Sequence, residues 1–335
     1  MAISRRNFLK VSASAGAIAA APSLLLSACK KEIAAALKRS PVIWIQAQSC
    51  SGCSVSLLNG QNPGIAELIT QKISLDFHQT VGGGTGEALL QVIEKAVEKK
   101  RNDFVLIVEG SIPSKSDLYC TLGEKNGNAT AMREWILNLG RNAKALVAVG
   151  TCAAFGGIPA ASLTGLAGNP TGAQPLSRLF PGKPVVNVPG CPPHPDWMMG
   201  TLVHFLLKGL PELDEFNRPK MFYDVVVHEK CSRLPEFDAG RYAEKWGEPG
   251  CLYLLGCLGM DSGCDIPTRQ WLSANSCTGC GSGCIGCTEP VFPDTGNRGL
   301  YPHLRAGRDA IERNVTHTPL RQALLKRLEK GAAHV

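Results

Sequence analysis

Fourteen cysteines in 335 residues are the first feature of this sequence that needs a chemical explanation. Two of them, Cys50 and Cys53, form a C-x-x-C pair directly after a short apolar run, and Cys152 and Cys191 follow two further runs of this kind. Such thiols bind an iron–sulfur cluster or zinc, or form disulfides. A C-x-x-C pair beside a buried strand is more often redox-active or metal-bound than a structural bridge, so the pattern favours iron–sulfur and leaves zinc and disulfides open.

Eight of the cysteines lie after residue 210, in two further groups. One group combines an imidazole with three thiols: His228, Cys231, Cys251 and Cys257. Zinc and iron–sulfur clusters both accept this ligand set. The other group has one thiol more than a four-ligand site needs, and its two C-x-x-C pairs resemble those of bacterial ferredoxins. Its members are Cys264, Cys277, Cys280, Cys284 and Cys287.

The elements that must position the first group are short apolar runs that end in glycine or polar residues. They predict five strands, over 41–47, 73–78, 103–110, 145–150 and 184–190. Helical patterns lie between them, most clearly over 86–100, where the apolar residues form one stripe. This alternation predicts a flavodoxin-like doubly wound parallel sheet. Because Cys50, Cys53, Cys152 and Cys191 all follow predicted strands, we expect them at the carboxyl edge of that sheet, where such folds bind ligands.

The pattern changes near residue 210, where glycine, proline and cysteine become frequent. The fold class we predict is therefore α/β, with a flavodoxin-like domain over 40–209 and an irregular, cysteine-rich iron–sulfur domain over 210–300. A charged tail over 301–335 completes the chain. A region with few strand or helix signals depends on cross-links or metal for its stability.

The first 28 residues have the features of a targeting signal. The string SRRNFLK over 4–10, followed by a mild apolar stretch, has the paired arginines of a twin-arginine export signal. That route carries folded proteins, which predicts a periplasmic chain with a cofactor inserted before export. The following LSAC resembles a lipobox, so Cys29 is either a lipidation site that holds the chain at a membrane or a spare cysteine near a cleavage site.

The net charge of +7 includes three cations within the first ten residues. No stripe of lysine and arginine with interleaved aromatic residues is present, so nucleic acid is not an expected partner.

Seven motifs in order now carry a resemblance to a known family: CSGCSVSLLN, VEGSIP, GTCAAFGGIPAA, PGCPPHPDWMMGTL, HEKC, GCLG and GCIGCTEP. Over about residues 40–295 the chain resembles the electron-transferring small subunit of nickel–iron hydrogenases. The residues of the first motif favour the nickel–iron–selenium branch. The resemblance implies a hydrogenase whose nickel–iron site, and hence catalysis, lies in a separate large subunit. It also implies three iron–sulfur clusters in this chain, passing electrons to a periplasmic multihaem cytochrome c or to a membrane quinone-linked acceptor.

On the matching positions, the resemblance implies a ligand set for each cluster. The proximal [4Fe–4S] cluster would take Cys50, Cys53, Cys152 and Cys191; the medial cluster Cys264, Cys277, Cys284 and Cys287; and the distal [4Fe–4S] cluster His228, Cys231, Cys251 and Cys257. The commonest members have a proline at the position of Cys277 and a medial [3Fe–4S] centre, so Cys277 implies a medial [4Fe–4S] cluster. Glu109 is either a proton relay beside the proximal cluster or an ordinary carboxylate at the end of a strand. Cys120 and Cys280 have no ligand role, and we expect them to be small buried residues.

Two alternative functions remain consistent with the sequence. The cluster-bearing subunit of a respiratory quinone reductase shares the flavodoxin-like domain and a PGCPP cysteine but needs neither the export signal nor the later cysteine groups. A secreted, non-enzymatic zinc or disulfide protein would contain no iron.

Overall fold

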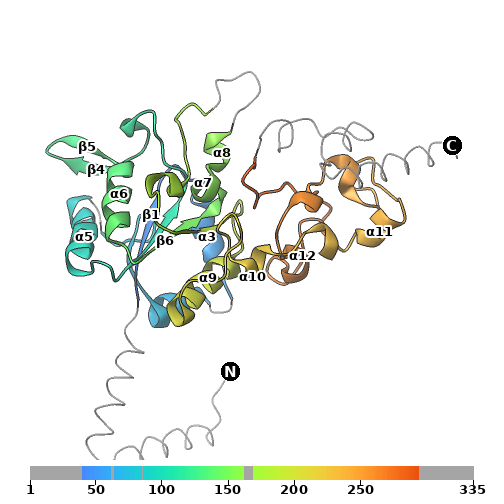
Figure 1. The fold of residues 1–335 in the computed structure, drawn as a ribbon, viewed down its shortest axis with the longest axis horizontal. Helices are drawn as coiled ribbons and strands as arrows, with labels where there is room; N and C mark the ends of the chain where they lie inside the picture. The colour runs from blue at the N-terminus through green and yellow to red at the C-terminus, as the bar shows by residue number, and fades with distance from the viewer. Residues whose placement is uncertain (1–39, 62–63, 85, 162–168, 294–335) are drawn as a thin grey trace, which may run out of the picture.

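The computed structural model describes residues 40–61, 64–84, 86–161 and 169–293 (Figure 1). The predicted export signal, Cys29 and the predicted tail lie outside these ranges.

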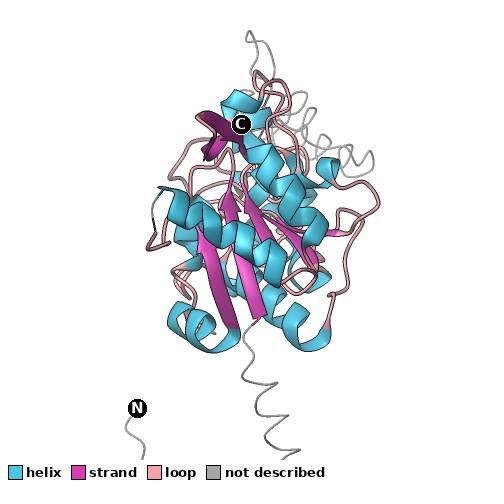
Figure 2. Cartoon of the chain, turned by 90° about the vertical axis from the view of Figure 1, so that its left-hand side faces the viewer, coloured by secondary structure: helices cyan, strands magenta, loops and turns pink. Residues whose placement is uncertain are grey.

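A five-stranded parallel sheet forms the centre of the first part of the chain (Figure 2). Its strands are β1 (Ser40–Gln46), β2 (Ile73–His78), β3 (Val105–Glu109), β6 (Ala145–Val149) and β7 (Val185–Val188). They lie in the order β2-β1-β3-β6-β7, and each neighbouring pair is parallel. Counted along the sheet strands alone, this is the 2-1-3-4-5 order of flavodoxin-like folds. The predicted strands and fold class are confirmed.

Two apolar cores cover the two faces of this sheet. Along β1, Ile43 and Ile45 belong to one core, whereas Val42 and Trp44 belong to the other, as the alternation of side chains along a strand requires. The first core is closed by α5 (Gly86–Lys99) and α6 (Met132–Asn142), and the second by α9 (Pro195–Lys208). Because both faces are buried, the central strands β3 and β6 are almost continuously apolar, which made them recognisable in the sequence.

A two-stranded antiparallel hairpin, β4 (Thr121–Lys125) with β5 (Asn128–Ala131), is not among the predicted elements. Most of its residues are exposed and polar, so the apolar runs that marked the other strands are missing. The Asn126–Gly127 dipeptide at its turn has positive φ at both residues, 52° and 76°, and was the available signal.

The remaining elements are short. Within the first part of the chain they are α3 (Gly52–Leu57), α4 (Ile65–Glu67), the π-helical turn η1 (Leu68–Lys72), η2 (Asp117–Tyr119), α7 (Gly150–Phe155), α8 (Gly157–Ala160) and η3 (Leu176–Leu179). After residue 210 they are α10 (Lys220–Tyr223), η4 (His228–Lys230), α11 (Leu234–Asp238), η5 (Leu252–Leu255), η6 (Gly259–Asp261) and α12 (Ile266–Arg269).

The region after residue 210 lies beside the sheet-containing part and consists of loops joined by these short turns of helix (Figure 1). Two small apolar clusters inside it form around Phe237 with Tyr253 and around Leu252 with Leu255. This agrees with the predicted irregular, cysteine-rich region.

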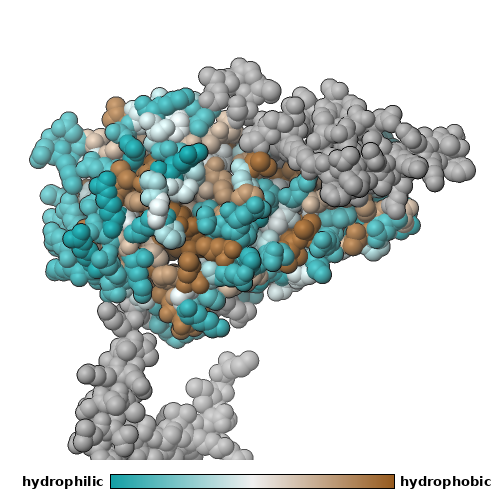
Figure 3. All heavy atoms as spheres, in the orientation of Figure 1, coloured by the Kyte–Doolittle hydropathy of each residue, from teal (hydrophilic) through white to brown (hydrophobic). Residues whose placement is uncertain are grey.

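The surface has both polar areas and apolar patches (Figure 3). Among the exposed apolar side chains are Val55 on α3 and Leu58 directly after it, which are 58% and 54% exposed. Among the described residues, no helix has the length and apolar character needed to cross a bilayer.

Candidate metal centres

The first thiol group gathers at the carboxyl edge of the sheet. Cys53 lies on α3 just after β1, Cys152 lies on α7 just after β6, and Cys191 follows β7. Burial raises the pKa of the Cys53 thiol well above its usual range, and Glu109, Cys152, Cys50 and Cys191 raise it further through their charges. The structure therefore brings together the four thiols that the sequence placed at this edge.

Two glycines leave room for these sulfur atoms. At Gly150 the backbone has φ +82°, and an added Cβ would lie 2.5 Å from the Cys53 Sγ. At Gly157 an added Cβ would lie 2.8 Å from the Cys152 Sγ. No side chain fits at either position, so the backbone turns after β6 form a cradle that only glycine allows.

Glu109, at the end of β3, is buried beside this group. Its Oε1 accepts hydrogen bonds from the Cys53 backbone N–H at 3.1 Å and from the Ser49 hydroxyl at 3.1 Å. Its Oε2 accepts from the Trp44 indole N–H at 3.0 Å and from the Ser54 hydroxyl. The carboxylate thus ties the first turn of α3 to the sheet and fixes where the Cys53 thiol lies.

The second thiol group surrounds a cavity of about 140 Å³. Apolar side chains, including Trp197, Ile266 and Trp271, line much of its wall, together with a few serine and threonine residues. The thiols that line it are Cys191, Cys264, Cys277, Cys284 and Cys287. Cys191 belongs to the first group by its position after β7, so the first two groups meet at this cavity.

Cys280 is not part of the cavity wall. It is exposed, and its thiol donates a hydrogen bond to the Ser276 backbone carbonyl at 3.0 Å. The expectation that Cys280 is a small buried residue is therefore wrong. Cys277 and Cys280 are both exposed, but of the two only Cys277 lines the cavity. Cys120 is half-buried against the first core of the sheet, as expected.

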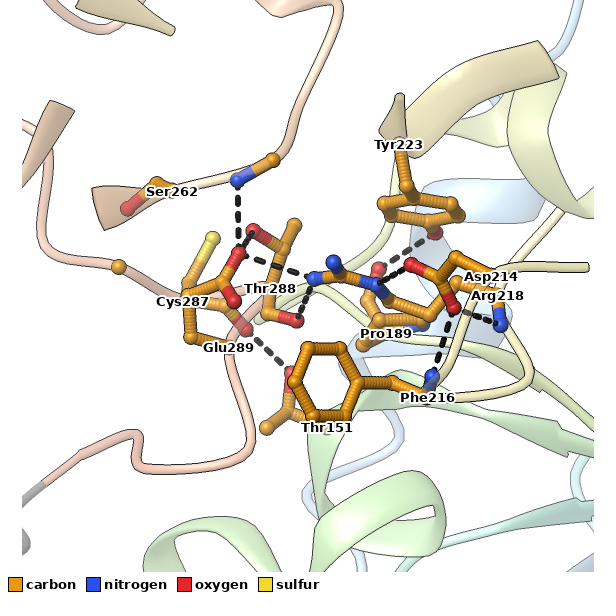
Figure 4. A network of polar contacts seen from close by, with 12 residues as sticks. Thr151, Pro189, Asp214, Phe216, Arg218, Tyr223, Ser262, Cys287, Thr288 and Glu289 are labelled. Atoms are coloured by element: carbon orange, nitrogen blue, oxygen red, sulfur yellow. Dashed lines mark hydrogen bonds and ion pairs between the residues drawn. The ribbon is translucent and has the colours of Figure 1, made fainter. Parts of the chain in front are cut away.

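A buried ion-pair network holds the segments that carry two of the cavity thiols (Figure 4). The Arg218 guanidinium donates to Asp214 at 2.7 Å, to Glu289 at 2.9 Å and to the Thr288 carbonyl at 3.1 Å. Glu289 also accepts from the Gly263 N–H at 2.7 Å. Thr288 and Glu289 follow Cys287, and Gly263 precedes Cys264, so Arg218 fastens both thiol-bearing segments. The motifs gave no sign of this network.

The same segments are bound to the edge of the sheet. The Thr151 hydroxyl donates to the Cys287 carbonyl and accepts from the Gly190 N–H at 2.9 Å, and the Tyr223 hydroxyl donates to the Pro189 carbonyl at 2.8 Å (Figure 4). The second thiol group is thereby joined to the ends of β6 and β7.

The third group lines a separate, smaller cavity that contains His228, Cys231, Cys251 and Cys257. Burial lowers the pKa of His228, which favours the neutral imidazole that a metal requires. Burial also raises the pKa of the Cys251 and Cys257 thiols to about 11. The His228 ring packs edge-on against Phe237, with a centroid distance of 4.5 Å.

Successive groups adjoin one another. The backbone N–H of Cys284, in the second group, donates to the Cys257 Sγ of the third group at 3.2 Å. Cys287 of the second group and Cys191 of the first line the same cavity, where burial raises the pKa of the Cys287 thiol and the charge of Cys191 raises it further. The three groups therefore form one row, from the sheet edge into the region after residue 210.

The donor sets fit iron–sulfur clusters. Every cysteine in the described ranges is a free thiol, and within these ranges no three His, Cys, Asp or Glu side chains converge closely enough to hold a single metal ion. The cavity of about 140 Å³ is many times the space that one water molecule needs. Buried thiols with raised pKa values are neutral when free, and bound metal supplies the positive charge that stabilises their thiolate forms.

A doubly wound sheet with thiol groups at its carboxyl edge, followed by further thiol and imidazole sets, defines an electron-transfer protein of the iron–sulfur class. Two family models match the chain. Residues 50–205 match the 20 kD subunit of NADH ubiquinone oxidoreductase, and residues 223–298 match the C-terminal domain of NiFe/NiFeSe hydrogenase small subunits.

Among curated proteins, the chain is 40% identical to the periplasmic [NiFeSe] hydrogenase small subunit of Desulfomicrobium baculatum, with 88% of this chain and 97% of that one covered. It is also 40% identical to the quinone-reactive Ni/Fe-hydrogenase small chain of Wolinella succinogenes, with 88% and 82% covered. The reduced Ni-Fe-Se hydrogenase from Desulfomicrobium baculatum superposes with a TM-score of 0.74 at 44% identity, covering 81% of this chain and 100% of that one. The chain belongs to the family of nickel–iron and nickel–iron–selenium hydrogenase small subunits.

The family decides between the three readings of the sequence. The chain is the electron-transfer small subunit of a heterodimeric hydrogenase, and its cofactors are iron–sulfur clusters. The match to a quinone reductase subunit covers only the sheet-containing part, which explains why that alternative shared the PGCPP cysteine. The reading as a non-enzymatic zinc or disulfide protein is wrong, because the relatives are hydrogenase subunits.

Proposed function

We propose that this chain holds three clusters in a row, with the ligand sets that the sequence implied. The proximal set is Cys50, Cys53, Cys152 and Cys191; the medial set is Cys264, Cys277, Cys284 and Cys287; and the distal set is His228, Cys231, Cys251 and Cys257. When bound, the clusters supply one-electron carriers between the large subunit, where H2 reacts, and an external acceptor. The observation that carries the proposal is that each group adjoins the next: Cys191 lines the cavity of the medial thiols, and the Cys284 N–H donates to the Cys257 Sγ of the distal set.

Cys277, rather than Cys280, is the fourth medial ligand. Cys277 lines the second cavity, and its charge raises the pKa of the buried Cys284 and Cys287 thiols, whereas Cys280 does not line that cavity. Four thiols then complete a [4Fe–4S] site. In Cys277→Ser we expect conversion to a [3Fe–4S] centre, seen as a new EPR signal in the oxidised protein. The matched Cys280→Ser variant keeps the original spectrum, and the reverse result would exchange the two roles.

Glu109 acts by positioning α3. It accepts hydrogen bonds from the Cys53 and Ser54 backbone N–H groups. Its remaining partners are the side chains of buried Trp44, Gln46 and Ser54 and half-buried Ser49. The proton-relay role stays a prediction, and the hydrogen bond from the Ser54 hydroxyl, which is also 3.0 Å from His78 Nε2, is compatible with it.

The large subunit is expected to cover the end of α3. Val55 and Leu58 expose apolar side chains close in sequence to Cys53, and exposed apolar patches mark protein interfaces. An interface there would put the proximal ligands next to the partner, where electrons enter this chain.

Export by the twin-arginine route, a periplasmic location and lipidation of Cys29 complete the proposal. The relative from Desulfomicrobium baculatum is called periplasmic, which supports export. The relative from Wolinella succinogenes is called quinone-reactive, which supports a membrane quinone-linked acceptor beside the alternative of a multihaem cytochrome c.

Anaerobic purification of the complex in mild detergent from its native host, with nickel, selenium, iron and N-terminal mass analysis, tests the proposal. We expect a nickel-bearing partner to co-purify and the mature chain to begin at or near Cys29. A brown chain that never travels with a nickel protein, or a colourless chain without iron, would contradict it.

A further inference from the structure

One residue of the medial loop reaches the distal group. Thr278 follows Cys277, is 3% exposed, and lines both the cavity of the medial thiols and the cavity of the distal set. Val227 shares both walls, but Thr278 is the polar residue of the two. A buried hydroxyl between two redox sites needs a hydrogen-bond partner.

That partner is a distal ligand. The Cys231 thiol donates to the Thr278 hydroxyl, with 3.2 Å between Sγ and Oγ1. A metal-bound thiolate carries no proton, so in the loaded protein the direction must reverse and the hydroxyl must donate to the sulfur. The other side-chain oxygen near Thr278 Oγ1 belongs to Ser276, at 3.5 Å, which is a weaker contact.

Arg233 fixes Thr278 in this position. Its Nε donates to the Thr278 carbonyl at 2.8 Å, and its Nη1 donates to the Gly250 carbonyl at 2.7 Å. Its own backbone N–H points at the Cys231 Sγ, 3.4 Å away. The Arg233 charge also opposes the effect of burial, which raises the pKa of the Cys251 thiol. One cation therefore joins the loops of Thr278 and Cys251 and lies near two distal thiols.

We propose that Thr278, held by Arg233, tunes the reduction potential of the distal site upward by donating a hydrogen bond to the Cys231 sulfur. Reduction adds negative charge, and a hydrogen bond or a nearby cation at a ligand sulfur stabilises that charge. Because Thr278 follows a medial ligand, the loop that completes the medial site also sets the potential of the next site. This inference rests on the proposed ligand sets.

The test compares Thr278→Val with Thr278→Ser in the intact heterodimer, by redox titration monitored by EPR together with iron and sulfide analysis. Valine keeps the shape of threonine without the hydroxyl, and serine keeps the hydroxyl. We expect unchanged iron content in both variants, a distal midpoint potential shifted downward in Thr278→Val alone, and no shift at the proximal site. Equal distal potentials in the two variants, at full iron content, would overturn the inference.

If Thr278→Val does not assemble, Arg233→Gln and Arg233→Lys make the same comparison through the charge. We expect a lower distal potential in Arg233→Gln and a smaller change in Arg233→Lys, and an unchanged potential in Arg233→Gln would overturn the inference. Wild-type heterodimer without a distal signal would instead overturn the ligand sets, and the inference with them.

Discussion

Replacing Arg218 by methionine should destabilise the protein far more than breaking a surface ion pair. The side chains of Arg218, Asp214 and Glu289 are 7%, 15% and 12% exposed, so the substitution leaves two carboxylates without their cation and with little solvent. Removing one partner of a buried pair costs about 3–5 kcal/mol. At 2–4 °C per kcal/mol, this lowers Tm by roughly 6–20 °C. Because the Thr288 carbonyl loses its donor and Glu289, which holds Gly263, loses its cation, medial iron should be lost at lower temperature than proximal iron.

The matched control is Arg241→Met, which breaks the exposed pair between Arg241 and Glu236, whose side chains are 63% and 35% exposed. Such a pair is worth about 0.2–1 kcal/mol, so its Tm should change by no more than a few degrees. Adding Glu289→Gln to Arg218→Met should recover part of the loss, since one of the unpaired charges is then removed. The assay is thermal unfolding of the loaded complex, followed by circular dichroism and by cluster absorbance. Equal Tm values for Arg218→Met and Arg241→Met would refute the claim that this network holds the medial segments.

Two other predictions concern the thiols. Gly150→Ala should displace the Cys53 sulfur and lose proximal iron. The control is Gly182→Ala, which should show only backbone strain, because Gly182 has the same φ of +82° and no atom lies within 4 Å of the added Cβ. Equal iron contents in the two variants would argue against the cradle. In the iron-free chain, burial raises the pKa of the Cys284 thiol from 9 to about 12. The contribution of this thiol to the free energy of unfolding is therefore fully present below pH 9 and is lost as the pH rises toward 12. Urea unfolding across this range should show a smaller loss in Cys284→Ser, by about 1.4 kcal/mol for each pKa unit removed, and identical slopes would contradict the assignment.

The sheet could be predicted because its strands are buried on both faces. The central strands β3 and β6 are nearly continuous apolar runs, and α5 shows one apolar stripe. The place of Cys50, Cys53, Cys152 and Cys191 then follows from the order of strands alone. The β4–β5 hairpin carries few buried side chains, so the same reasoning did not find it.

Other parts of the site depend on contacts that spacing does not encode. Cys277 and Cys280 belong to one C-x-x-C pair and are both exposed, and only the turn of the loop brings Cys277, but not Cys280, to the cavity wall. Arg218 and Glu289 are 71 positions apart, and neither belongs to a metal-ligand pattern. The role of Thr278 was missed because it lies within a C-x-x-C pair, where only the cysteines attract attention. A hydroxyl next to a ligand can nevertheless bind a neighbouring sulfur, as Thr278 does with Cys231.

Acid-labile sulfide in the purified heterodimer tests the central claim most directly, because the nickel–iron site of the partner adds iron but no inorganic sulfide. Three [4Fe–4S] clusters predict about twelve sulfides for each copy of this chain. A value near eight would show that one of the three ligand sets is not used. Zinc with no sulfide would contradict the account altogether.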